Sequence, residues 1–264
     1  MKFQIRDKKK KDLFISIFQV LKNCSNTICC VFDKETLRIQ GMDKSHVCLF
    51  EVTLNQSWFD EYALEEKKIV SFDSTMFHSI ISTKSDHQCL LFKMDDTDDV
   101  LLIDFVPLEE GLEVKSKKTD KSFKKFFKLP LTTNDYEELH IPAADYDAEF
   151  TICSKHIDDI FTQLGAFGND IVMQCSEENI FFTTNGVTGE MRVQIPIDDV
   201  SSYSVVEGEE LALTYSLLYL NKMCITNKLS EHIEFSLSND CPMKIHYPLG
   251  EESNIVFYMA PKVV

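Results

Sequence analysis

The stretch Leu37-Arg-Ile-Gln-Gly-Met-Asp-Lys-Ser-His46-Val-Cys-Leu49 decides the fold when it is taken with a second stretch, Asn254-Ile-Val-Phe-Tyr258-Met-Ala-Pro261-Lys262. A third stretch, Leu139-His-Ile141-Pro142-Ala-Ala-Asp-Tyr146, lies between them in the chain.

Asp43 and His46 resemble catalytic residues, but no nucleophile accompanies them, and a histidine beside a turn is more often a hydrogen-bonded structural residue. The sequence contains no phosphate-binding loop, dinucleotide fingerprint, nucleophile elbow or metalloprotease motif. With no nucleophile beside Asp43 and His46 and none of these motifs, we do not expect an enzyme.

Charge is distributed unevenly along the 264 residues, whose formal net charge is −16. A protein that coats DNA is usually basic overall, so this total argues against simple nucleic-acid binding. The lysines are nevertheless bunched, with one block at Lys8 to Lys11 and a second that consists of Lys115, Lys117, Lys118, Lys121, Lys124, Lys125 and Lys128. An acidic surface with basic strips repels DNA except where the strips face it. Ordinary solvated charge explains any single run equally well.

Cysteines and acidic residues give no sign of a metal or cofactor site. Nine cysteines form no zinc-ligand or disulfide framework spacing, which favours reduced, mostly buried thiols. The cluster Asp95-Asp96-Thr-Asp98-Asp99 lacks the glycine and the distal glutamate of a calcium loop, so we expect a solvated hairpin tip. No signal peptide and no apolar run of roughly 20 residues is present, and we expect a soluble intracellular protein.

The two halves of the chain can be laid over each other. Phe3-Gln-Ile5 and Asp12-Leu-Phe14 parallel Phe150-Thr-Ile152 and Asp159-Ile-Phe161 at a shift of 147, and Lys84 falls on Lys228 at a shift of 144. The pattern predicts two copies of one domain at residues 1–131 and 147–264, joined by a polar, extended connector at 132–146.

Within each copy, periodicity predicts helices and strands. Apolar residues at helical spacing predict helices over 13–21 and 157–164, and shorter helices are expected at 74–82 and 216–224. Alternating residues predict strands at 191–195 and 233–237. Mixed short helices and long sheets indicate an α+β protein.

The three stretches resemble the sliding-clamp family of proliferating cell nuclear antigen (PCNA). Met42-Asp-Lys-Ser-His46-Val is similar to the family's Met-Asp-Ser-Ser-His-Val, and Tyr258-Met-Ala-Pro261-Lys262 to its Tyr-Leu-Ala-Pro-Lys. The third stretch falls on the family's interdomain connector, and the similarity runs nearly end to end. The resemblance implies the DNA clamp fold, with two duplicated domains that have inner helices and outer antiparallel sheets. It also suggests a divergent, or virus-encoded, member of the family.

The resemblance implies a function in replication or repair without catalysis, metal or cofactor. A homotrimeric ring is expected to encircle double-stranded DNA without sequence preference. With a clamp loader's help it would tether DNA polymerase and other clients that carry the family's interaction motif. The location implied is the nucleus, or a cytoplasmic replication site for a virus-encoded member. The alternatives are a subunit of a heteromeric checkpoint-type clamp, a monomeric processivity factor, and a clamp-shaped interaction module that does not encircle DNA.

The resemblance also implies a client-peptide pocket, which accepts a short turn carrying one aliphatic and two aromatic anchors. Its expected residues are Met42, His46, Val47, Leu49, Leu139, Ile141, Pro242, Tyr258, Met259, Ala260 and Pro261. Core packing is the better interpretation for any one of these residues alone.

DNA contact is expected from residues near the helix ends. The expected DNA-facing residues are Lys8, Lys9, Lys10, Lys11, Lys22, Lys84, Lys155, His156, Lys222 and Lys228. Other positions where the family has lysine or arginine carry Ser79, Ser82, Gln163 and Leu218, which lowers the expected pore charge.

The resemblance implies that the strand of Phe126 and Phe127 pairs with the strand of Met191 and Val193 in a neighbouring copy; the alternative is a strand buried inside one subunit. The lysine-rich residues 115–125 are extra relative to typical members, and form either a solvent loop or an added binding finger. Glu177 replaces the family's ubiquitin-accepting lysine, so we expect no such modification in this turn.

Overall fold

A computed structural model describes residues 1–94, 99–108, 123–133, 136–187 and 189–262. The chain divides into two compact units, of which the first comprises Met1–Ile39 and Thr53–Glu137 and the second Gln40–Val52 and Glu138–Val264. Residues 40–52 are thus part of the second unit although they belong to the first half of the sequence. The predicted hairpin tip at 95–99 and the extra residues 115–125 lie mostly outside the described residues.

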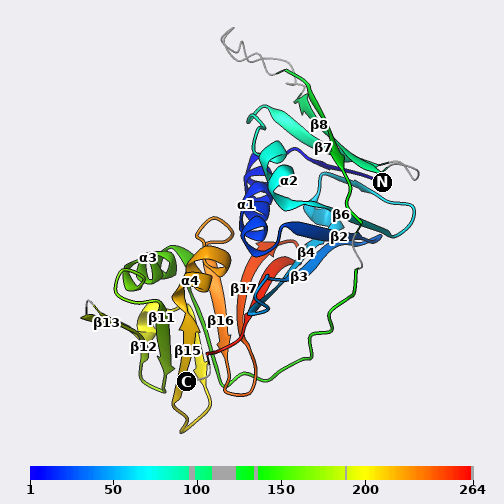
Figure 1. Ribbon diagram of the computed structural model, residues 1–264. Helices are drawn as coiled ribbons and strands as arrows, with labels where there is room; N and C mark the ends of the chain where they lie inside the picture. Colours follow the sequence, from blue (N-terminus) through cyan, green and yellow to red (C-terminus); the bar gives the residue numbers. More distant parts are fainter. Residues whose placement is uncertain (95–98, 109–122, 134–135, 188, 263–264) are drawn as a thin grey trace. The chain divides into compact units, whose positions relative to one another are not determined.

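The first unit has two helices and two groups of antiparallel strands (Figure 1). One sheet has the order β5-β1-β7-β8-β9, and β2 pairs with both β6 and the first part of β3. The elements are β1 (Lys2–Ile5), α1 (Lys8–Cys24), β2 (Thr27–Phe32), β3 (Thr36–Met42), β4 (Cys48–Asn55), η1 (Gln56–Trp58), β5 (Glu61–Ala63), β6 (Lys68–Asp73), α2 (Ser74–Ile81), β7 (Gln88–Lys93), β8 (Val100–Pro107) and β9 (Lys125–Pro130). The ends of β3 and β4 that flank residues 43–47 belong to the second unit.

The second unit repeats this arrangement. Its strands follow the orders β14-β10-β16-β17-β18-β4 and β13-β12-β11-β15. The elements are β10 (Ala148–Cys153), α3 (Ser154–Leu164), β11 (Asp170–Cys175), β12 (Ile180–Gly186), β13 (Gly189–Ile195), η2 (Ile197–Asp199), β14 (Ser202–Val205), β15 (Leu211–Ser216), α4 (Leu217–Tyr219), η3 (Leu220–Cys224), β16 (His232–Leu237), β17 (Met243–Gly250) and β18 (Ser253–Met259).

The duplication predicted from the sequence is visible in the strand register. Phe3 on β1 lies opposite Phe92 on β7, with the rings stacked at 4.4 Å, and Phe150 on β10 lies opposite Phe235 on β16, with the rings stacked at 4.9 Å. Stacked aromatic pairs at matching places bury large apolar areas at the same point of each core. The α+β fold with two similar halves is confirmed.

The predicted helices form where amphipathic periodicity indicated them. Asp7 caps α1 by accepting a hydrogen bond from the Lys10 amide at 2.9 Å, and Phe14, Ile17 and Phe18 bury one face of the helix. In the described residues no helix is long and apolar enough to cross a membrane. The segment 216–224 is more irregular than the single helix predicted, since one turn of α-helix is followed by the π-helix η3, closed by a hydrogen bond from the Ile225 amide to the Leu220 carbonyl at 2.8 Å.

The connector residues described between 132 and 146 form neither helix nor strand. Its beginning is fixed to the first unit by the Thr132 amide, which donates to the Ser71 carbonyl at 2.8 Å. Its end is fixed within the second unit, where the Asp147 amide donates to the Leu237 carbonyl at 2.9 Å. Both ends of the segment are therefore anchored by backbone hydrogen bonds.

Candidate client-binding surface and lysine sites

The last stretch of the chain lies beside the first of the three sequence stretches. β18 pairs with β17 on one side and neighbours β4 on the other. Beyond the end of β18, the Ala260 amide donates to the Val47 carbonyl at 3.1 Å. The Lys262 amide then donates to the Thr214 carbonyl at 2.8 Å. These two bonds hold Ala260 beside Val47 and Lys262 beside Thr214.

The turn between β3 and β4 is organised by the carboxylate of Asp43. This side chain is buried and accepts hydrogen bonds from the amides of Ser45 at 2.8 Å, Val47 at 2.7 Å and Cys48 at 2.7 Å. His46 has a φ of 56°, in the left-handed region that most side chains avoid. Three charge-assisted bonds hold the turn in this shape. Asp43 is thus a structural residue, which agrees with the rejection of a catalytic role.

The connector reaches the same surface through Gln40. The Gln40 side-chain nitrogen donates to the Leu139 carbonyl at 2.8 Å, and its oxygen accepts from the Leu139 amide at 2.7 Å. The same nitrogen donates to Glu51 at 3.0 Å. The side-chain amide therefore bonds to the connector as a neighbouring strand would, and places Leu139 beside β3.

Tyr258 lies on the solvent-accessible face of β18. It is partly exposed, whereas the next residue, Met259, is fully buried because successive side chains of a strand point to opposite faces. Burial, and then the charge of Glu51, raise the pKa of the Tyr258 hydroxyl. Burial chiefly raises the pKa of Tyr146 to about 12, and Cys241 and Tyr258 contribute to this rise.

Ten of the eleven expected pocket residues are partly or fully exposed on the second unit, namely Met42, His46, Val47, Leu49, Leu139, Ile141, Pro242, Tyr258, Ala260 and Pro261. Met259 requires a correction, since its side chain is 0% exposed and belongs to the core. The contacts described above join the β3–β4 turn, the connector and the C-terminal segment. These were the three separate stretches of the sequence.

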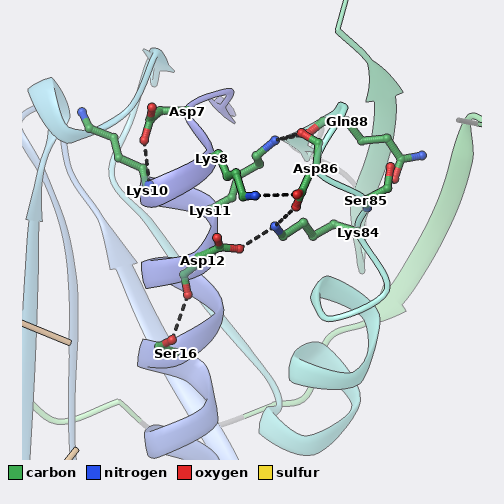
Figure 2. A network of polar contacts seen from close by, with 10 residues as sticks. All are labelled: Asp7, Lys8, Lys10, Lys11, Asp12, Ser16, Lys84, Ser85, Asp86 and Gln88. Atoms are coloured by element: carbon green, nitrogen blue, oxygen red, sulfur yellow. Dashed lines mark hydrogen bonds and ion pairs between the residues drawn. The ribbon is translucent and has the colours of Figure 1, made fainter. Parts of the chain in front are cut away.

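The lysine site of the first unit consists of the start of α1 and the turn after α2 (Figure 2). Lys8 forms an ion pair with Asp86 at 2.6 Å, while Lys84 contacts Asp12 at 2.5 Å and Asp86 at 3.4 Å. Lys8 holds the pKa of the Asp86 carboxyl below its usual value, with Lys84 contributing, so this carboxylate is ionised at neutral pH.

Two residues expected to face DNA are withheld from solvent in this site. Lys11 is 0% exposed, and its ammonium donates to the carbonyls of Asp86 at 2.9 Å and Gln88 at 2.5 Å (Figure 2). Burial and then Lys84 lower the pKa of Lys11. The expectation for Lys11 is wrong, because its charge is used inside the protein. The Lys84 side chain is only 7% exposed, which corrects its assignment as an accessible residue.

The lysine site of the second unit is arranged differently. Lys155, His156 and Lys228 are exposed. Lys155 and Lys228 line a hollow of about 670 Å³ together with Ser154 and Ser230. Neither lysine makes an ion pair within 4.0 Å to any residue that the structure describes.

The remaining expected DNA-facing residues lie on or near helices. Lys9 and Lys222 are exposed, and Lys10 lies over the Trp58 ring at 5.7 Å from the centroid. The Lys22 ammonium donates to Nδ1 of His78 at 3.1 Å. Burial, followed by Lys22, lowers the pKa of His78, so its imidazole is neutral at pH 7.

The two strands expected at subunit contacts are both the last in their sheets, β9 in the first unit and β13 in the second. Phe126 is 68% exposed, whereas Phe127 packs on Phe105 with the rings 5.1 Å apart. Met191 and Val193 are half-buried. Edge strands with free backbone groups are able to pair with another chain.

Sequence reasoning missed the partners that hold these sites. Gln40 carried no signal, because a glutamine on a strand is ordinary until its distant partner is known. In the sequence, Asp12 marks the duplication without indicating an ion pair, and Asp86 belongs to no predicted site. Asp86 could have been found by asking which acids flank Lys84 in the turn.

A duplicated α+β protein with a surface formed by these three segments is a clamp-type protein, and comparison with known proteins agrees. Residues 6–128 match the family described as "Proliferating cell nuclear antigen, N-terminal domain", and residues 140–262 match its "C-terminal domain". The chain is 28% identical over 241 residues to the proliferating cell nuclear antigen of Chaetomium thermophilum, with 89% of each chain covered. The chain belongs to the PCNA family, as the sequence resemblance predicted.

Membership of the PCNA family indicates the general function of the protein. It is a sliding-clamp-type protein of DNA replication and repair rather than an enzyme. In general terms, its partners are DNA, polymerases and other client proteins, and it works as a multimeric clamp.

Proposed function

We propose that three copies of this chain close into a ring around duplex DNA and tether DNA polymerase and other client proteins to it. The ring is loaded by a clamp loader and works at sites of replication in the nucleus, or in the cytoplasm if the protein is virus-encoded. Tethering raises processivity because a polymerase that dissociates is kept at a high effective concentration near the primer end.

The main support for this proposal is that three segments, far apart in the sequence, lie on one surface of the second unit. Val47, Leu139 and Tyr258 come from the β3–β4 turn, the connector and the end of β18, and hydrogen bonds fix the first two in place. Exposed apolar side chains held by a rigid backbone provide anchoring sites for aromatic residues of a client. The half-buried Met42 can adapt to different clients.

Ring closure is supported by the edge strands. β9 and β13 each leave one side without a strand partner among the described residues. Head-to-tail pairing of β9 in one copy with β13 in the next would satisfy both edges and cover Phe126. Since a closed ring uses one β9 and one β13 from each copy, the same contact recurs at every junction.

Primer extension on a singly primed circular template tests the proposal. With a polymerase and clamp loader from the same source, the protein should lengthen the products made in a single binding event. The same reaction on linear DNA with free ends should show less stimulation, because a sliding ring leaves at an end. Equal product lengths with and without the protein would contradict the proposal.

A further inference from the structure

The duplicated lysine sites differ in one respect that bears on DNA contact. Lys8 and Lys84 of the first unit correspond to Lys155 and Lys228 of the second, at shifts of 147 and 144. Both first-unit lysines are paired with carboxylates, at 2.6 Å and 2.5 Å. Within the described part of the chain, their second-unit counterparts make no ion pair. Lysines at equivalent sequence positions of the two copies therefore differ in whether a carboxylate pairs with them.

The cause is the absence of one acidic partner and the unpaired state of the other. At the same shift of 144, Ser230 stands where the first copy has Asp86, so the acid that binds both Lys8 and Lys84 has no counterpart. Asp159 corresponds to Asp12, but it is exposed and forms no ion pair with any residue that the structure describes. Two other acids lie near Lys228: Glu231 lines the same hollow, and Asp158 accepts a hydrogen bond from the Asn227 side chain at 2.8 Å.

The buried Lys11 fixes the turn that carries Asp86 against the start of α1. Its ammonium joins α1 to the carbonyls of Asp86 and Gln88, and so holds the Asp86 carboxylate beside Lys8 and Lys84 (Figure 2). The start of α1 is also capped by the Asp7 carboxylate, whereas Cys153, at the N-cap position of α3, makes no side-chain cap hydrogen bond. Lys8 and Lys84 are balanced by Asp12 and Asp86, so these four groups present no net charge to a phosphate.

We propose that the two copies have divided roles: Lys155 and Lys228 contact DNA phosphates, and Asp12 and Asp86 withdraw Lys8 and Lys84 from DNA. The inference rests on the proposed clamp function. It assigns Asp12 and Asp86 as residues that weaken the attraction of this surface for DNA. Weak, sequence-independent phosphate contact allows a ring to slide, because each additional lysine contact tightens and slows it.

Charge-removing variants test the division of roles. Affinity for a fluorescently labelled duplex of about 30 base pairs would be measured by anisotropy at several salt concentrations. Lys155→Gln with Lys228→Gln should lower the affinity about tenfold at low salt and reduce the slope of log K against log salt by about 2. Lys8→Gln with Lys84→Gln should change the affinity less than about twofold, because these charges are already paired. Equal losses from the two pairs would overturn the inference.

Because Lys84 is largely buried, misfolding of its variant would also lower the affinity for DNA. A variant that is expected to raise the affinity is therefore measured as well. Asp12→Asn with Asp86→Asn keeps the shape of both side chains and should raise the affinity several-fold. Its matched control is Glu61→Gln with Asp104→Asn, which removes two carboxylates paired with Lys2 at 2.6 Å and Lys93 at 3.0 Å in the same unit. An equal gain in the control would show a general charge effect and overturn the inference.

Duplex affinity tests the divided roles of the lysines, and primer extension separately tests the clamp function. If no variant binds the short duplex, including the Asp12 and Asp86 double variant, the divided roles are wrong. Stimulation of primer extension on circular DNA then still decides whether the protein is a clamp. If the variants behave as expected but stimulation is absent, the lysine assignment stands without ring function.

Discussion

The side-chain amide of Gln40 and the backbone of Leu139 exchange two hydrogen bonds, at 2.8 and 2.7 Å, across 99 positions of sequence. Through this pair, a segment without helix or strand is held beside β3 at a defined register. The apolar side chains of the connector can therefore serve a rigid binding surface, although the connector has no regular structure of its own.

Gln40→Ala should release this part of the connector. The Leu139 amide loses its acceptor, so its hydrogen exchange should quicken at least tenfold, and affinity for a client peptide should fall by about 1 to 2 kcal/mol because the surface is no longer pre-organised. The matched control is Gln194→Ala, which removes an exposed bond to Asn179 of 2.7 Å in the same unit. Unchanged exchange at Leu139 would contradict the role of Gln40.

Tyr258→Ala should remove the main aromatic contact of the proposed client surface. Truncation of a central aromatic anchor costs about 2 kcal/mol or more, or roughly a 30-fold loss of affinity. Titration calorimetry with a peptide that carries one aliphatic and two aromatic anchors measures this loss, while the mass of the oligomer should not change. Tyr258→Phe keeps the ring and should retain most of the affinity. Undiminished binding by the alanine variant would refute the pocket assignment.

Asp43→Ala should destabilise the β3–β4 turn, because three backbone amides lose a charged acceptor. We expect a loss of about 3 kcal/mol in the free energy of unfolding, measured by urea denaturation, and a smaller loss for Asp43→Asn, which retains one acceptor oxygen. His46→Gly should be tolerated, since glycine adopts the φ of 56° without strain. A loss below about 0.5 kcal/mol for the alanine variant would show that the turn does not depend on Asp43.

His78 should make the stability depend on pH. Its pKa is lowered in the folded protein by burial and by Lys22, so between that value and the unfolded value of about 6.5 the unfolded chain binds more protons. This contribution to stability is present above about pH 6.5 and is lost as the pH falls toward the folded pKa. His78→Gln should therefore lose less stability than the wild type between pH 7.5 and 5.5. Identical losses in the two proteins would contradict this assignment.

The fold could be predicted from the sequence because its signals are local or repeated. The apolar face of α1 and the shift between Phe3 and Phe150 needed no knowledge of distant contacts. The lysine sites were harder, since a lysine on a predicted helix end gives no sign of whether a carboxylate will meet it. Lys11 and Lys84 were assigned to DNA for this reason, and only the turn that carries Asp86 shows them to be enclosed.

The burial of Met259 is a second feature that the sequence motif alone did not predict. Its neighbour Tyr258 is partly exposed and Ala260 is exposed, and the family motif predicts all three in one pocket. The alternation of β18 sends the middle side chain into the core, where Met243 lies opposite it on β17. A motif assigns a role to a segment, whereas strand geometry decides which of its side chains can take part.

Solution mass by light scattering across a dilution series, near physiological salt, tests the central claim most directly. A closed trimeric ring should give about three times the 30.4 kDa chain mass, unchanged on dilution, because each copy would pair its β9 edge with the β13 edge of the next. A stable monomer at all concentrations would contradict the closed ring, and with it the proposal that this chain encircles DNA on its own.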